Sequence, residues 1–235
     1  MRLLVGTSGF SYEPWRGTFY PEDLGTDEML AHYASKLDAV EINNTFYRMP
    51  SRDVVARWRQ QVPAHFRFAV KASRRITHQH KLAGTGELLT FLQGSLREMG
   101  ETLACVLFQV PKWVRKDLDL LRQFLAELPA ELHPVFEFKH PSWTDADAVS
   151  VLTEHRASLC ANDEECEDLP PLTVTSDLGY LRLRREAYDD ATLRELCVRL
   201  RESGWPQALV FFKHEDAGAG PRLAARLRQL FAETT

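Results

Sequence analysis

Two glutamates stand inside stretches that otherwise have the pattern of buried β-strands. Glu41 lies between two β-branched residues, and Glu137 lies between two phenylalanines. Successive side chains of a strand point to opposite faces, so each carboxylate opposes its apolar neighbours. In a parallel sheet covered by helices the carboxylates would point to the interior, where an unpaired charge is costly. Glu41 and Glu137 are therefore expected to be paired or to take part in acid–base chemistry.

Basic and amide side chains follow the same alternation. With the bulkiest apolar face of each predicted strand outward, six strands place polar residues inward, mostly near their C-terminal ends. These residues are Glu41, Asn43, Lys71, Gln109, Glu137, Lys139, Arg182 and Lys213. His140 comes three positions after Glu137 and could act as a general acid or base. We predict four catalytic residues, which are Glu41, Lys71, Glu137 and His140.

The turns and loops after the strands add candidate ligand-binding side chains. Ser8 could offer its hydroxyl to an anion, His78 stands where a lid would lie, and Tyr47 and Trp143 could stack on a sugar or base. Each has a plainer alternative: a turn serine, a solvated histidine, or aromatic rings that seal the core. For His140 the alternative is a hydrogen bond within its own turn. The predicted ligand-binding residues are Ser8, Asn43, Tyr47, His78, Gln109, Lys139, Trp143, Asp163, Arg182 and Lys213.

The inward charges do not balance. Two acids face four bases, which are Lys71, Lys139, Arg182 and Lys213. An internal salt-bridge network is the alternative to a binding site, but it leaves a positive surplus that a buried network tolerates poorly. We expect a small anionic ligand, carrying a phosphate, sulfate or carboxylate, to balance it. Isomerisation and hydrolysis are both compatible with these residues.

Two other functions stay open. Glu41, Glu137, His140 and Asp163 resemble the ligand supply of a metal-dependent phosphoesterase or endonuclease, although the neighbouring lysines disfavour a divalent ion. No HExxH motif occurs, so we assign no metal ligand and identify no cofactor. Basic groups beside aromatic rings could also belong to a non-catalytic, nucleic-acid-linked module. A net charge of −4 disfavours broad binding to a nucleic-acid backbone.

The elements that must position these residues recur regularly. Apolar runs repeat about every 30 residues, and a helical pattern follows each, the weakest after the sixth run. The predicted strands cover 3–5, 39–43, 66–71, 104–110, 135–139, 157–161, 180–183 and 208–213, with a possible side strand at 172–175. We predict a single-domain (β/α)8 TIM barrel over 1–235. A doubly wound open sheet is the alternative, but residues 6–9 match no dinucleotide or phosphate-binding motif.

The composition is typical of a globular protein with a full core. Hydrophobic residues make up 44% of the chain and charged residues 26%. The four cysteines lack CxxC spacing, and no apolar run approaches the ~20 residues of a membrane span. The first residues predict a strand rather than a signal peptide. We therefore expect a reducing, cytoplasmic setting, and the sequence indicates no oligomeric state.

Several ordered motifs together resemble the YecE-like family. They are GTSGF at 6–10, WRGTFYP at 15–21, EINNTFYRMP at 41–50, FQVP at 108–111 and EFKHPSW at 137–143, with Lys71 and Thr77-His78 between them. The resemblance spans most of the chain. It implies a TIM barrel and no established activity, substrate or cofactor. Two departures fall near the C-terminus: residues 183–185 read LRR where members often have His-Gly, and 213–216 read KHED where members often have an Asn-rich turn.

Overall fold

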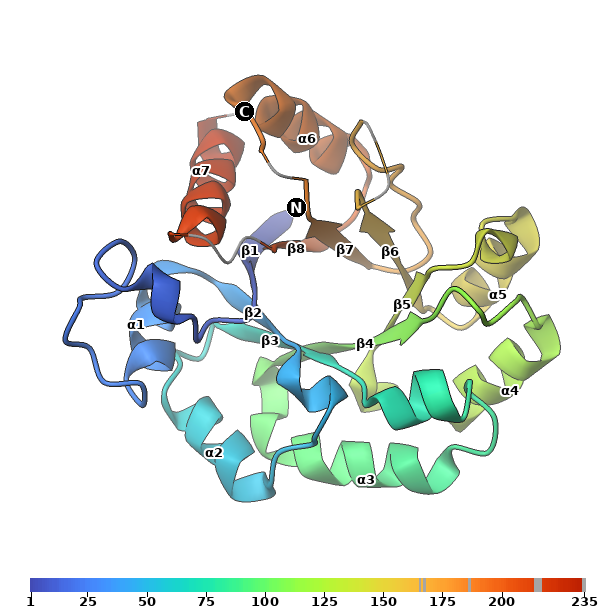
Figure 1. The fold of residues 1–235 in the computed structure, drawn as a ribbon. Helices are drawn as coiled ribbons and strands as arrows, with labels where there is room; N and C mark the ends of the chain where they lie inside the picture. Colours follow the sequence, from blue (N-terminus) through green and yellow to red (C-terminus); the bar gives the residue numbers. More distant parts are fainter. Residues whose placement is uncertain (165, 167, 186, 214–216, 234–235) are drawn as a thin grey trace.

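Eight parallel strands close into a barrel in sequence order (Figure 1). The structure, a computed structural model, describes residues 1–164, 166, 168–185, 187–213 and 217–233. The strands are β1 (Arg2–Ser8), β2 (Ala39–Ile42), β3 (Arg67–Lys71), β4 (Leu103–Val110), β5 (Pro134–Phe138), β6 (Ser158–Asn162), β7 (Leu178–Leu183) and β8 (Gln207–Phe212). The barrel is closed by pairing of β1 with β8. The predicted TIM-barrel fold is confirmed.

Helices surround the barrel, as Figure 1 shows looking along its axis. They are α1 (Met29–Lys36), α2 (Arg52–Gln60), α3 (Gly86–Leu96), α4 (Leu118–Glu127), α5 (Ala146–Glu154), α6 (Asp190–Glu202) and α7 (Ala219–Glu233). None of the helices in the described ranges has both the length and the hydrophobicity to cross a membrane.

The connection between β6 and β7 differs from the prediction. Its described residues form neither the weak helix nor the side strand expected at 172–175. Instead, Thr175 Oγ1 donates to the carbonyl of Ala157 and accepts from the backbone N–H of Leu159. A side chain here satisfies backbone groups at the start of β6 that a strand would otherwise pair, so the predicted strand is wrong.

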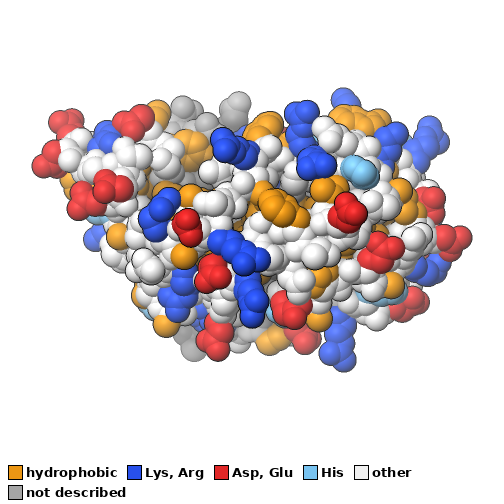
Figure 2. Space-filling view, turned by 90° about the horizontal axis from the view of Figure 1, so that it is seen from below, with side chains coloured by type: hydrophobic (Ala, Val, Ile, Leu, Met, Phe, Trp, Pro, Cys, Tyr) orange, Lys and Arg blue, Asp and Glu red, His pale blue; other side chains and the backbone are white. Residues whose placement is uncertain are grey.

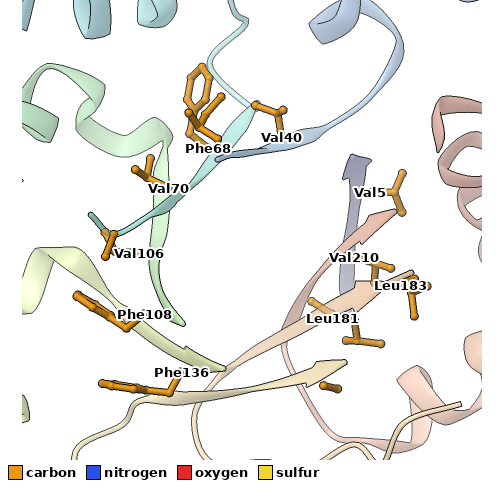
Figure 3. Packing of buried hydrophobic residues seen from close by; sticks show 14 of the residues in the cluster. Val5, Val40, Phe68, Val70, Val106, Phe108, Phe136, Leu181, Leu183 and Val210 are labelled. Atoms are coloured by element: carbon orange, nitrogen blue, oxygen red, sulfur yellow. The ribbon is translucent and has the colours of Figure 1, made fainter. Parts of the chain in front are cut away.

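The outward faces of the strands form the main core. Figure 3 shows these side chains pointing away from the barrel toward the helices. The cluster includes Val5, Val40, Phe68, Val70, Val106, Phe108, Phe136, Leu181, Leu183 and Val210, all at most 3% exposed. A second apolar cluster fills the inside of the barrel, with Leu4, Leu107, Val135, Tyr180, Leu209 and Phe211 among its members. The predicted alternation of outward and inward residues is therefore confirmed for these strands.

Candidate functional site

Arg182 bridges the two glutamates inside the barrel. It comes from β7, and its Nη2 lies 2.9 Å from Glu41 Oε1 while its Nη1 lies 2.5 Å from Glu137 Oε2. The three side chains are at most 2% exposed. A planar guanidinium can serve two carboxylates at once because its donors form a fixed fork. The predicted inward direction of all three residues is confirmed, and here they form a paired network.

Glu41 is saturated with hydrogen bonds. Its Oε1 accepts from Ser8 Oγ at 2.8 Å and from Asn43 Nδ2 at 2.9 Å, and its Oε2 accepts from the Tyr180 hydroxyl at 2.6 Å. Burial acts to raise the pKa of Glu41, but Arg182 and these donors outweigh it and lower the pKa below its ordinary value. Glu41 is thus held as an anion, and its partners leave little room for a second role.

Glu137 is held in the same way from neighbouring strands. Its Oε2 accepts from Gln109 Nε2 at 2.6 Å, and its Oε1 accepts from Asn162 Nδ2 and lies 2.9 Å from Lys139 Nζ. Burial would raise the pKa of Glu137, yet Arg182 and Lys139 hold it well below its usual range. Lys139 also pairs with Glu164 at 2.6 Å. Both of its partners are carboxylates, so Lys139 contributes no surplus charge.

Lys71 is differently placed. Its Nζ donates to the Gln109 side-chain oxygen at 2.9 Å and lies 4.2 Å from the ring centroid of Phe46. Among the described residues, no carboxylate lies within ion-pair distance of this ammonium group. Burial, with a further contribution from Arg182, lowers the pKa of Lys71 to about 8. Of the predicted inward bases that do point inward, Lys71 is thus the one without a carboxylate partner among the described residues.

Aromatic rings continue outward from Lys71. Phe46 contacts Tyr47 at 5.1 Å and His78 at 4.9 Å between ring centroids, and His78 contacts Trp113 at 5.5 Å. His78 Nδ1 also lies 2.8 Å from the Thr77 hydroxyl. Burial, Lys71 and a nearby arginine lower the pKa of His78. Tyr47 is 75% and Trp113 59% exposed, so the mouth of the barrel offers ring surface to solvent.

Trp143, His140 and Asp163 were predicted as site residues, but their side chains stabilise loops and turns instead. The Trp143 ring is 2% exposed, stacks on Phe138 at 4.3 Å and donates from Nε1 to the carbonyl of Val114. His140 Nδ1 accepts from the backbone N–H of Ser142 at 3.0 Å, the turn contact that was its alternative.

Asp163 is fully buried beside β7. It accepts from the backbone N–H of Arg184 at 2.7 Å and from the Tyr188 hydroxyl. The Lys213 side chain is exposed, one residue beyond the end of β8, so its predicted inward direction is wrong. The strand has ended there, and alternation no longer fixes the direction of the side chain. The rest of the altered turn, His214 to Asp216, lies outside the described residues.

Three residues of this network were missed in the sequence. Tyr180 donates to the buried Glu41, and Phe46 and Trp113 build the aromatic row. Tyr180 lies two positions before Arg182, so the alternation already placed it on the inner face. The contact between Phe46 and Trp113 through His78 joins three loops that only the closed barrel brings together.

The carboxylates do not converge as metal ligands. Glu41 and Glu137 face Arg182 between them, and Asp163 is turned toward β7. Within the described ranges, no group of three or more His, Cys, Asp or Glu side chains could hold a metal ion. The donor set therefore does not support the metal-dependent alternative.

A cavity of about 300 Å³ opens beside the glutamate network, between the ends of β5 and β6. The two strands pair only at Val135–Ser158 and Phe136–Leu159, and beyond these positions they separate. The cavity has a polar side toward the barrel and an apolar side toward α5. Its lining includes Glu137, Lys139 and Asn162 on the first side and Phe138, Trp143 and Leu159 on the second. A small molecule could therefore enter next to the buried charges.

A family model, a curated relative and solved structures match this chain. The family model described as "Protein of unknown function DUF72" matches residues 4–235. The UPF0759 protein YecE of Escherichia coli K12 is 32% identical over 115 residues, which cover 48% of this chain and 42% of YecE. The chain thus spans less than half the length of this relative in the match.

Solved structures of the same description share the fold. A DUF72 family protein from Thermotoga maritima MSB8 has a TM-score of 0.82 at 25% identity, covering 99% of this chain and 100% of that one. A DUF72 family protein from Enterococcus faecalis V583 has a TM-score of 0.77 at 21% identity, covering 100% and 98%.

Proposed function

The chain belongs to the DUF72 family of proteins of unknown function, and on that premise we propose that it binds a small phosphate- or carboxylate-bearing molecule at the C-terminal mouth of its barrel. Residues at the C-terminal ends of barrel strands are where TIM-barrel proteins keep their sites. Here these ends carry Lys71, Gln109 and the Arg182–glutamate network.

One observation carries the proposal: Lys71 is a half-buried ammonium group without a carboxylate partner in the described structure. Burial lowers its pKa most, and Arg182 and Arg184 act in the same direction, while Glu137 and Glu41 act against them. A partly desolvated cation without a carboxylate partner is costly unless an anion joins it. A phosphate or carboxylate would provide that charge and would accept hydrogen bonds from Nζ.

The same features suggest how chemistry would proceed. Glu41 and Glu137 are held ionised by Arg182, so near neutral pH they have no proton to donate and are weak bases. Lys71, with a pKa of about 8, would exchange a proton at that pH far more readily. In an isomerase or a hydrolase, Lys71 would be the acid–base group, and the Arg182 network would keep the pocket rigid.

Anion-dependent thermal stability tests the proposal. Sulfate and phosphate should raise the melting temperature more than chloride at equal ionic strength, because only the folded state has the site. Lys71→Met should reduce that difference to the general stabilisation that sulfate and phosphate give any folded protein. Lys36→Met, which removes an exposed lysine of α1, should retain the full difference. An equal sulfate effect in wild type and Lys71→Met would contradict the proposal.

A further inference from the structure

Three consecutive loops at the mouth carry positive charge only. The loops after β2, β3 and β4, residues 43–50, 72–85 and 111–116, contain no Asp or Glu. Their lysines and arginines are Arg48, Arg74, Arg75, Lys81, Lys112, Arg115 and Lys116. In a chain whose net charge is −4, this is a marked local excess of positive charge. We call these three loops the basic rim.

Most cations of the basic rim have no internal partner. Lys116 pairs with Asp145, but the other six are exposed and take part in no ion pair among the described residues. Charges that stabilise a fold usually lie beside opposite charges. Exposed, unpaired and single-signed charges instead create a field that attracts a polyanion.

The four rings described above lie in the same three loops. Phe46 and Tyr47 belong to the first, His78 to the second and Trp113 to the third. Successive ring contacts of 5.1, 4.9 and 5.5 Å join the loops into one row. Exposed tyrosine and tryptophan rings are costly to leave in water, and each here adjoins a cation in the sequence, Tyr47 before Arg48 and Trp113 after Lys112.

From this juxtaposition we propose that the basic rim is a binding surface for single-stranded nucleic acid. Such surfaces combine cations that follow the phosphates with aromatic rings on which successive bases stack. A row of rings that crosses three loops matches an extended ligand with repeated flat groups. Duplex DNA is disfavoured because its bases are already stacked, so the rings would have no partner.

The charge of the whole molecule does not oppose this surface. Counterion release depends on the cations that meet the phosphates, and not on the net charge. The face that carries α2 and α3 contrasts with the rim, because cationic and anionic side chains alternate on it (Figure 2). That face also supplies a control, since Phe91 on α3 is 61% exposed, close to the 59% of Trp113.

Intrinsic fluorescence gives a direct test of stacking. Trp113 is the most exposed tryptophan, whereas Trp15, Trp143 and Trp205 are at most 3% exposed. Titration with a single-stranded oligothymidylate should quench the wild-type emission. Trp113→Phe should remove most of the quenching. Undiminished quenching in Trp113→Phe, or no quenching at low salt in the wild type, would overturn the proposal.

Anisotropy of a labelled oligothymidylate tests affinity. Trp113→Ala and Tyr47→Ala should each weaken binding at least about fivefold, as loss of one stacked base predicts, and Phe91→Ala should not. The double variant Arg74→Ala/Arg75→Ala should make the decrease of log K with log salt less steep by about 1.4, at ~0.7 for each of two phosphate contacts. Arg57→Ala/Arg59→Ala on α2 should leave the slope unchanged. Equal losses in the control variants would overturn the proposal.

Binding of a polyanion without bases distinguishes base stacking from general attraction between charges. Dextran sulfate should bind more weakly than the oligonucleotide, and its binding should not respond to Trp113→Ala. If it binds equally well, the rim is a general polyanion surface and the proposal fails. The inference does not rest on the anion at Lys71. The difference in sulfate stabilisation between wild type and Lys71→Met tests that site alone, so each proposal can fail separately.

Discussion

At the scale of single residues, the buried charges differ in whether they are already neutralised. Arg182 meets two carboxylates, and Lys139 meets Glu137 and Glu164, while Lys71 meets an amide and a ring. Substitution at Lys71 and substitution at Arg182 should therefore change stability in opposite directions, which the following two predictions use.

Replacing Lys71 by methionine should stabilise the ligand-free protein. Its pKa of about 8 lies below the ~10.4 of an unfolded lysine, so between these values the unfolded chain binds more protons. Wild-type stability should consequently rise with pH across that window. Because Lys71 is partly solvated, we expect Lys71→Met to gain only about 1–2 kcal/mol at neutral pH, measured by urea unfolding. A variant less stable than wild type would contradict this, and Lys36→Met is the control.

Replacing Arg182 by methionine should destabilise the protein. Leaving buried carboxylates without their cation costs about 3–5 kcal/mol near neutral pH. In the wild type the pKa values of Glu41 and Glu137 are lowered, so stability is present above the unfolded value of ~4.3 and is lost as pH falls. In the variant burial dominates and raises the pKa of Glu41, so stability should increase as pH falls from 7 toward 5.

The sign of that pH slope is the measurement. Urea unfolding at several pH values compares the variant with Arg228→Met, which breaks an exposed ion pair with Asp38 at 3.2 Å and should change stability by less than about 1 kcal/mol. If Arg182→Met does not fold, Arg182→Lys keeps one contact and should show a weaker form of the same slope. A slope equal to that of wild type would disprove the account.

At the scale of elements, alternation along each strand predicted most of the site. It fixes the inward direction of Glu41, Lys71 and Arg182 because they lie within or at the end of regular strands. It could not fix His140 or Asp163, whose partners lie in turns and satisfy local backbone groups. Nor could it fix which inward residues meet, since that depends on strand order and register around the closed barrel.

Gly179 tests how tightly β7 packs against Trp205, which lies between α6 and β8. The outer face of β7 carries Leu181 and Leu183, but at position 179 a Cβ would lie 2.4 Å from the Trp205 ring. Gly179→Ala should therefore displace Trp205 and cost about 1–3 kcal/mol by overpacking. Thermal unfolding and near-UV circular dichroism of Trp205 measure both effects.

Gly94 on α3 provides the matched control. A Cβ there meets only the end of the flexible Arg52 side chain, at 3.3 Å. Alanine is favoured over glycine inside a helix by up to about 1 kcal/mol, so Gly94→Ala should be neutral or stabilising. If Gly179→Ala were as well tolerated as Gly94→Ala, the close packing of β7 against Trp205 would be disproved.

At the scale of the whole molecule, the pairings between neighbouring strands, which we call the seams of the barrel, differ in length. The β1–β8 and β7–β8 pairs each extend over six register positions, and the β5–β6 pair extends over two. The cavity beside Glu137 lies where β5 and β6 separate, and there Asn162 reaches across to the Glu137 carboxylate. A side-chain contact thus replaces backbone pairing at the weakest seam, next to the candidate site.

Hydrogen exchange should show this difference. Amides of β6 should exchange faster than those of β1 and β8, because local opening is easiest where ladder bonds are fewest. Asn162→Ala should raise exchange at β6 and at the end of β5 and leave β1 and β8 unchanged. Asn43→Ala removes a similar amide bond, but one within its own segment, to Glu41. It should therefore leave the β5–β6 seam unaffected. Uniform exchange across all eight strands would mean that the barrel opens only as one unit, and that the cavity is not a point of easy access to the buried charges.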